Sequence, residues 1–238
     1  MIRDDLSRRA QGGPVLLVGA SEGGVVAAAA AAREPRITHI VLRIELALDR
    51  VVVHNDSHVS PVDGGEPGPL VLDGRGLELL SVAVDGVPAE AYEHDDRSLT
   101  LPLAAGRHVV STSVALVPGG VNDHGFTRRP TLLSTTCEPQ GFRRITYSLD
   151  RPSNRATYDV TLVADPVAFP VLLANGHRID SGVLDDGRHW ARFDDPITKP
   201  SYLFAVVAGA LDTTSCSYTT GSGRTLQLTV AAPPEQID

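Results

Sequence analysis

Cysteine is scarce in this sequence, which contains only Cys137 and Cys216. Two thiols are too few for a disulfide framework or for a four-cysteine zinc site, so both of these stabilising devices are excluded. A single disulfide bond between them stays open as an alternative. We favour two free thiols in a reducing compartment.

Positive charge is also scarce, and lysine is nearly absent. The 21 basic residues are almost all arginine, and they face 29 acidic residues, which gives a net charge of −8. The isoelectric point is near 5.4. Binding to nucleic acid requires a basic face against the phosphate backbone. We therefore expect no nucleic-acid partner.

Long apolar runs are missing as well. No stretch reaches the roughly 18 uncharged apolar residues that a membrane-spanning helix needs. Arg8 and Arg9 precede an apolar stretch from Pro14 to Ala32, an order that resembles a twin-arginine export signal. Glu22 interrupts this stretch, and the first residues of the chain are strongly polar. The sequence therefore predicts a cytoplasmic protein without a membrane partner.

Residues 1–35 differ in composition from the rest. A short Val/Leu run leads into a glycine-rich turn and then into six consecutive alanines, which favour a helix. The order strand, turn, helix resembles the start of a dinucleotide-binding unit. However, the spacing is not G-x-G-x-x-G, and no alternating strands and helices follow. We predict a short Ala-rich helical or irregular N-terminal extension over residues 1–35, followed by one domain over residues 36–238.

From residue 37 onward the pattern is typical of strands. Residues 38–48 alternate apolar and polar side chains with a period of two, which indicates a sheet with one buried face. Further strand candidates are residues 70–72, 77–84, 98–103, 108–116, 142–149, 156–164, 171–174, 188–193, 201–208 and 225–230. The breaks contain turn pairs that tolerate positive φ: Asp73-Gly74, Asp85-Gly86, Asn175-Gly176 and Asp186-Gly187. The sequence therefore predicts an all-β fold, a twisted antiparallel saddle or sandwich.

One segment is more specific. Residues 136–152 read TCEPQGFRRITYSLDRP, which resembles the segment T-Q-C-E-A-E-G-F-R-R-I-T-Y-x-L-D-R-P in the N-terminal β-domain of the aminopeptidase N family of zinc peptidases. Segments 169–178, 187–190, 195–196 and 199–209 keep the same register. The resemblance covers about residues 36–230.

In that family the domain is a twisted β-saddle that lies over a thermolysin-like catalytic domain. The catalytic domain supplies G-A-M-E-N for the substrate amine and H-E-x-x-H with a later Glu for zinc, and neither motif occurs in this sequence. His54 and His58 have the i, i+4 spacing but no general-base Glu between them, and a catalytic zinc needs three convergent protein ligands. The resemblance therefore implies no metal, no cofactor and no peptidase activity for these residues alone.

The resemblance also implies candidate site residues. Glu138 matches the family glutamate that helps to hold the α-ammonium group of the substrate. Thr136 stands where the family has Gln, and Gln140 stands at the second acidic position, so this edge of the cleft keeps one charge and loses one amide. Phe126 and Arg143 complete the substrate-binding candidates.

His124 and Tyr147 join Glu138 as catalytic candidates, because a loop histidine can transfer protons near neutral pH. Arg143 and Arg144 can pair with Asp150 and Glu138. Neighbouring side chains on a strand point to opposite faces, so at least one of these two arginines is expected to be structural. Cys137 has no activating base beside it and is not expected to act as a nucleophile.

Three functions stay open. The first is a domain that caps a separate zinc catalytic domain and contributes a carboxylate for a peptide-amine ligand. The second is a stand-alone enzyme of a biosynthetic pathway, of isomerase or cyclase type, that binds a small molecule without metal or cofactor and closes its cleft as a homo-oligomer. The third is a non-catalytic binding or scaffold protein. We favour the first.

Overall fold

The computed structural model describes residues 35–61, 68–120 and 123–237, and these are almost entirely strands and turns. The predicted all-β fold is confirmed. The residues from Pro35 onward group into one compact unit. The predicted N-terminal extension lies outside the described residues, except for Pro35. Among the described residues, no helix has the length and apolar character needed to cross a membrane.

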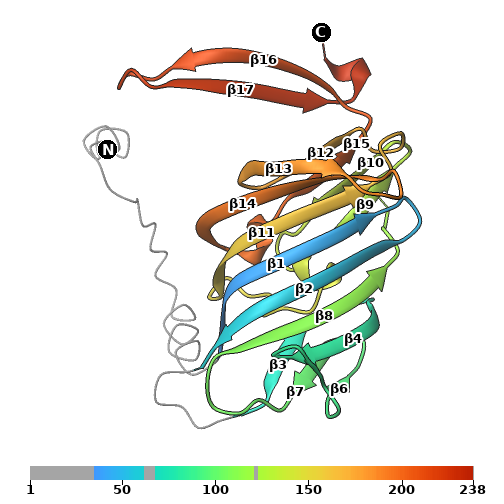
Figure 1. The fold of residues 1–238 in the computed structure, drawn as a ribbon, viewed down its shortest axis with the longest axis vertical. Coiled ribbons are helices and arrows are strands. Elements are labelled where there is room, and N and C mark those ends of the chain that lie inside the picture. Colours follow the sequence, from blue (N-terminus) through green and yellow to red (C-terminus); the bar gives the residue numbers. More distant parts are fainter. Residues whose placement is uncertain (1–34, 62–67, 121–122, 238) are drawn as a thin grey trace, which may run out of the picture. The chain divides into compact units, whose positions relative to one another are not determined.

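A large sheet of eight strands forms the centre of the domain (Figure 1). Its strands lie in the order β13 (His177–Val183), β14 (His189–Pro200), β11 (Arg155–Ala164), β1 (Arg36–Leu46), β2 (Val51–Ser60), β8 (His108–Leu116), β4 (Glu78–Val84) and β5 (Val87–Pro88). Neighbouring strands are antiparallel except for β1 and β11, which run parallel. The strand patterns in the sequence did not indicate this parallel pair.

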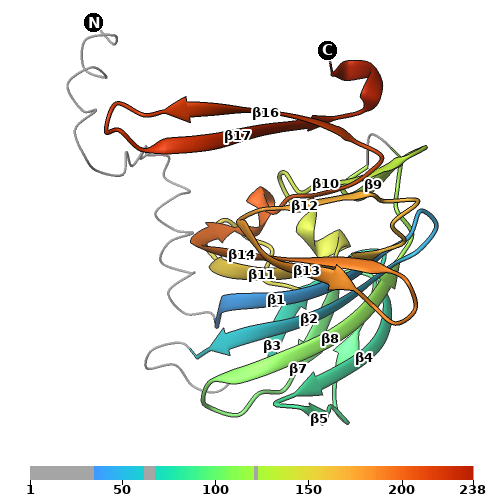
Figure 2. The same ribbon diagram turned by 45° about the horizontal axis from the view of Figure 1, so that its top comes forward.

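Two smaller sheets cover one face of the large sheet (Figure 2). The first consists of β12 (Val171–Ala174), β15 (Val206–Gly209), β10 (Leu132–Thr136) and β9 (Gly125–Arg129), and the second of β3 (Leu70–Asp73), β7 (Ser98–Leu101) and β6 (Glu93–His94). A hairpin of β16 (Asp212–Thr219) and β17 (Thr225–Ala232) forms a fourth sheet with most side chains exposed. The described residues also form three short 3-10 helices: η1 (Phe142–Arg144), η2 (Ser201–Leu203) and η3 (Pro234–Gln236).

The hydrophobic core lies between the large sheet and the two sheets that cover it. Along β1, Ile40, Leu42 and Ile44 are buried and alternate with half-buried side chains, as the period-two pattern predicted. These side chains pack in one cluster with Leu72 of β3 and Leu133 of β10. Burial of each such side chain stabilises the fold by about 2 kcal/mol. The opposite face of the sheet is polar and partly exposed, which matches a sheet covered on one side.

The prediction of a strand over residues 142–149 is wrong. The segment begins with η1 and continues as an irregular chain through the core, and Ile145 to Asp150 are all buried. From Ile145 onward the segment has no exposed face, so its sequence does not alternate between buried and exposed positions. Its backbone forms hydrogen bonds with several neighbouring elements. Asn55 of β2 donates to the Tyr147 carbonyl oxygen over 3.1 Å, and Ser148 exchanges two backbone hydrogen bonds with Asp73. The candidate strand over residues 201–208 likewise begins with η2, and only Val206–Gly209 is strand.

A buried carboxylate, Asp150, connects this irregular segment to its neighbours. Its oxygens accept hydrogen bonds from the backbone N–H of Arg143 (3.1 Å), from Arg143 Nε (3.0 Å) and from Ser201 Oγ (2.5 Å). Arg143 Nη2 also donates to the Asp150 carbonyl oxygen, and Arg143 Nη1 lies 3.4 Å from Asp73 Oδ1. The predicted pairing of Arg143 with Asp150 is therefore confirmed. This network joins η1, η2 and the end of β3.

Replacing Asp150 with alanine should lower the free energy of unfolding by about 3 kcal/mol, because it leaves the N–H and Nε of Arg143 and the Ser201 hydroxyl without their acceptor. Urea denaturation followed by circular dichroism measures the change. Ser201→Ala is the matched control and should cost about 1 kcal/mol, since it removes one hydrogen bond only. Equal losses in the two variants would contradict a central role for the carboxylate.

A second ion pair joins Asp85, in the turn between β4 and β5, to His108 at the start of β8. Asp85 Oδ2 is 2.7 Å from His108 Nδ1, and Asp85 Oδ1 accepts from the backbone N–H of Val109. The hydrogen bond that His108 donates to the Asp85 carboxylate is the main reason that the pKa of His108 is raised above its ordinary value. A raised folded-state pKa stabilises the fold below the unfolded value near 6.5, and this contribution disappears as the pH rises through the folded pKa.

Asp85→Asn should therefore cost more stability at about pH 6 than at about pH 8, because only protonated His108 gains from the carboxylate. Asn suits the position, since Asp85 has a φ of 52° and Asn tolerates this left-handed region. Urea denaturation of both proteins at both pH values gives the difference directly. A stability difference that is the same at the two pH values would show that the pair does not titrate as proposed.

Candidate functional site

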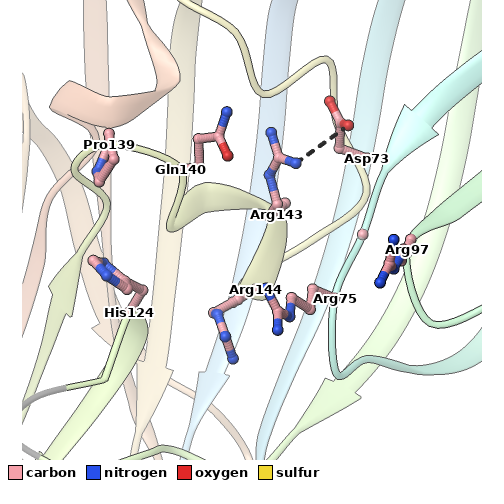
Figure 3. Close-up of a pocket in the computed structure, with 9 residues that line it drawn as sticks. Asp73, Arg75, Arg97, His124, Pro139, Gln140, Arg143 and Arg144 are labelled. Atoms are coloured by element: carbon pink, nitrogen blue, oxygen red, sulfur yellow. Dashed lines mark ion pairs between the residues drawn. The ribbon is translucent and has the colours of Figure 1, made fainter.

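A cavity of about 580 Å³ opens beside the irregular segment that Asp150 anchors (Figure 3). Its walls come from four places in the chain: the loop after β3, the turn between β6 and β7, the chain before β9, and the loop from β10 into η1. The lining residues are Asp73, Gly74, Arg75, Arg97, His124, Pro139, Gln140, Arg143 and Arg144. A smaller cavity of about 140 Å³ shares Arg75, His124 and Arg144 with it.

Backbone hydrogen bonds hold the arginine-bearing segments of this wall together. The N–H of Arg75 donates to the carbonyl oxygen of Arg143 over 2.8 Å, and the N–H of Gly74 donates to the carbonyl oxygen of Arg97 over 2.9 Å. The Asp95 carboxylate accepts the backbone N–H groups of Arg97 and Ser98, both at 2.8 Å. Three segments far apart in the sequence thus form one hydrogen-bonded unit.

Gly74 allows this wall to lie close to the core. A Cβ atom at this position would collide with the ring of Tyr147. The Asp73-Gly74 pair was predicted to form a positive-φ turn, but Gly74 does not have positive φ, unlike Gly86, Gly176 and Gly187 of the other three pairs. The glycine is needed here for close approach rather than for backbone conformation.

The structure brings three of the predicted site residues to this cavity: His124, Gln140 and Arg143. Thr136 and Glu138 lie on the same loop as Gln140, at the end of β10, and both are exposed. The Glu138–Pro139 peptide bond is cis. Among the described residues, no hydrogen bond or ion pair engages the Glu138 carboxylate, so the pairing of Glu138 with Arg144 that the sequence analysis considered is not formed.

Phe126 and Tyr147 are more deeply buried than the other predicted site residues, although Phe126 also lines the smaller cavity together with His124. Phe126 on β9 is 2% exposed and Tyr147 is 1% exposed, and both belong to the hydrophobic core. Burial raises the pKa of the Tyr147 hydroxyl, with Asp95 and Asp96 adding to the shift. Glu138, His124 and Tyr147 therefore do not share one solvent-facing surface.

Cys137 precedes Glu138 and is buried. Burial raises the pKa of its thiol to about 12, so the reactive thiolate is scarcely populated at neutral pH. Cys216 lies exposed on β16, and the two thiols are not joined by a disulfide bond. Neither cysteine belongs to the cavity wall.

The part of the chain that the structure describes contains no set of side chains that could bind a metal ion. No group of three His, Cys, Asp or Glu side chains converges there. His54 and His58 lie on the partly exposed outer face of β2, where His54 Nδ1 lies 2.8 Å from Ser113 Oγ and the His58 ring packs on His39 at 5.1 Å. A catalytic zinc ion of the kind found in metallopeptidases does not fit these residues, because a third ligand is missing.

Arg75, Arg97 and Arg144 are the cavity residues that the sequence did not assign to a site. Arg75 and Arg97 stand in turn sequences, where charged side chains are ordinary, and Arg144 was considered only for a structural ion pair. Their convergence depends on contacts between β3, the β6–β7 turn and η1. An alignment of many relatives could have revealed such contacts, but a single sequence contains no signal for them.

Comparison with known proteins agrees with this architecture. Residues 122–203 match the family model of the Peptidase M1 N-terminal domain. Aminopeptidase N of Caulobacter vibrioides is 44% identical over 176 residues, which cover 73% of this chain and 20% of that protein. Aminopeptidase N of Escherichia coli is 35% identical over 204 residues, which cover 85% of this chain and 23% of that protein.

Solved structures give the same result. The crystal structure of Legionella pneumophila aminopeptidase A in complex with aspartic acid superposes with a TM-score of 0.78 at 32% identity, covering 85% of this chain and 24% of that one. The chain spans about a fifth of the length of the curated relatives it matches. It therefore contains a β-domain of the Peptidase M1 N-terminal type, like the N-terminal domain of aminopeptidase N.

Proposed function

We propose that this β-domain caps the substrate cleft of a zinc-bearing peptidase domain and presents Glu138 to the free α-ammonium group of a peptide. The observation that supports this role is the state of the Glu138 side chain. It is exposed on the loop after β10, and no described residue forms a hydrogen bond or ion pair with its carboxylate. An unpaired carboxylate can meet an ammonium group without first breaking an internal salt bridge.

The loop that carries Glu138 is held in place on both sides. Cys137 is buried on one side, and the N–H of Gly141 on the other side donates to the Cys137 carbonyl oxygen over 2.7 Å. A Cβ atom at Gly141 would collide with the Thr136 carbonyl oxygen, so glycine permits this tight return of the chain. A charge on a rigid loop binds its partner with a smaller loss of entropy than a charge on a mobile one.

This role assigns binding and orientation to the described residues and bond cleavage to the zinc-bearing domain. Thr136 is too short to supply the second polar contact that the family glutamine makes, so Glu138 would hold the amine with less support. A substrate with a blocked amino terminus would lose the contact altogether. The proposed ligand class is therefore peptides with a free amino terminus.

A chimera tests the role of Glu138. Residues 35–237 replace the corresponding segment of Escherichia coli aminopeptidase N, and hydrolysis of an alanyl p-nitroanilide is measured. Glu138→Gln should raise KM about tenfold with a smaller change in kcat, since a charge-assisted hydrogen bond to the amine contributes in both the ground state and the transition state.

The matched control is Glu90→Gln, which neutralises an exposed carboxylate outside the loop and should leave KM unchanged. Thr136→Gln, which restores the amide, should lower KM. An unchanged KM in the Glu138→Gln chimera would contradict the proposal, and so would a chimera with Glu138 intact that folds and binds zinc but does not cleave the substrate.

A further inference from the structure

The cavity beside η1 is basic, although the protein as a whole is acidic. Four arginines line it, and Asp73 is the one carboxylate among the lining residues described, whereas the whole chain has a net charge of −8. One Asp73 oxygen lies 3.4 Å from Arg143 Nη1, so this carboxylate is already engaged. A concave surface with charges of one sign focuses the electrostatic field and attracts counter-charged ligands.

The four arginines have two different roles. Arg143 is structural, because its guanidinium is bound to Asp150 and Asp73. Arg75, Arg97 and Arg144 have no side-chain hydrogen bond or ion pair with any described residue. Most arginines with a purely structural role pair with a carboxylate or a carbonyl oxygen. The Arg97 side chain interacts with Asp95 only through its charge, which adds to backbone hydrogen bonds in lowering the pKa of that carboxyl. Arg75 and Arg97 are exposed and Arg144 is half-buried, so all three guanidinium groups are available to a ligand in the cavity.

The backbone positions of these three arginines are fixed relative to one another. Arg75 bonds to Arg143 beside Arg144, and Gly74 bonds to Arg97, so each arginine stands on the same hydrogen-bonded unit. Figure 3 shows the side chains on separate segments around the cavity. Holding three like charges near one another costs electrostatic energy, and an anion in the cavity would remove this cost.

The chemistry of the guanidinium group selects the ligand. Its planar fork donates two parallel hydrogen bonds to a carboxylate or a phosphate group, and it stays protonated at all ordinary pH values. A volume of about 580 Å³ suits a small molecule rather than a single ion. The geometry points to a binding site for a small ligand that carries two or more oxyanion groups, either carboxylates or phosphates, held by Arg75, Arg97 and Arg144.

Two probes distinguish the possible sources of the oxyanion. N-acetyl-triglutamate represents an acidic peptide, and pyrophosphate represents a phosphate compound. The acetyl group removes the α-ammonium, so binding of this peptide cannot involve amine recognition by Glu138. Isothermal titration calorimetry of the full chain in a low-salt zwitterionic buffer should detect binding of at least one probe. The affinity should fall as sodium chloride is raised toward about 0.15 M.

The triple variant Arg75→Gln, Arg97→Gln, Arg144→Gln should weaken binding of that probe about tenfold or more, because three charge-assisted contacts are lost. The matched control, Arg36→Gln, Arg129→Gln, Arg178→Gln, removes the same net charge from exposed positions outside the cavity and should change the affinity less than about twofold. The three single variants should each give an intermediate loss, and circular dichroism establishes that every variant is folded.

Binding of the peptide alone would assign the site to carboxylates, and binding of pyrophosphate alone would assign it to phosphates. Either outcome supports the inference. Failure of both probes to bind would overturn it, and so would equal losses in the triple variant and its control. Glu138→Gln should leave binding of both probes unchanged, so the outcome is independent of the proposed role of Glu138.

Discussion

The buried carboxylate of Asp150 is the constraint on which the site depends. It accepts hydrogen bonds from the backbone and side chain of Arg143 and from Ser201, and through Arg143 it is linked to Asp73 at the end of β3. Such a carboxylate is stable in the interior only when its oxygens are saturated with donors. The irregular chain of residues 142–149 therefore has one position relative to the sheets, and the cavity wall follows from it.

The fold could be predicted from the sequence because most of its strands lie on a sheet with one buried face. The alternation along β1 needs no knowledge of its neighbours, and the Asp-Gly and Asn-Gly pairs mark three turns correctly. The same argument fails for residues 142–149, where both sides of the chain are buried. It also misses β2, because the inward positions of this strand include the polar residues Asn55 and Ser57.

Only part of the candidate site could be predicted, because some of its residues come together through long-range contacts. The resemblance to a family identified the loop with Glu138, and the structure places Gln140, Arg143 and His124 around one cavity near it. The positions of Arg75 and Arg97 at the cavity depend instead on long-range hydrogen bonds from the loop after β3 to η1 and to the β6–β7 turn. Phe126 and Tyr147 are near the site in sequence, and both side chains are buried in the core.

Among the described residues, most of the groups that reach the cavity are suited to binding a ligand rather than to acting as nucleophiles or acids. The Cys137 thiol has a pKa of about 12, and the Tyr147 hydroxyl has a raised pKa in the core, so neither is an accessible nucleophile or acid at neutral pH. The groups that do reach the cavity are mainly guanidinium groups, which cannot give up a proton. Fixed cations beside an exposed carboxylate can orient a charged ligand.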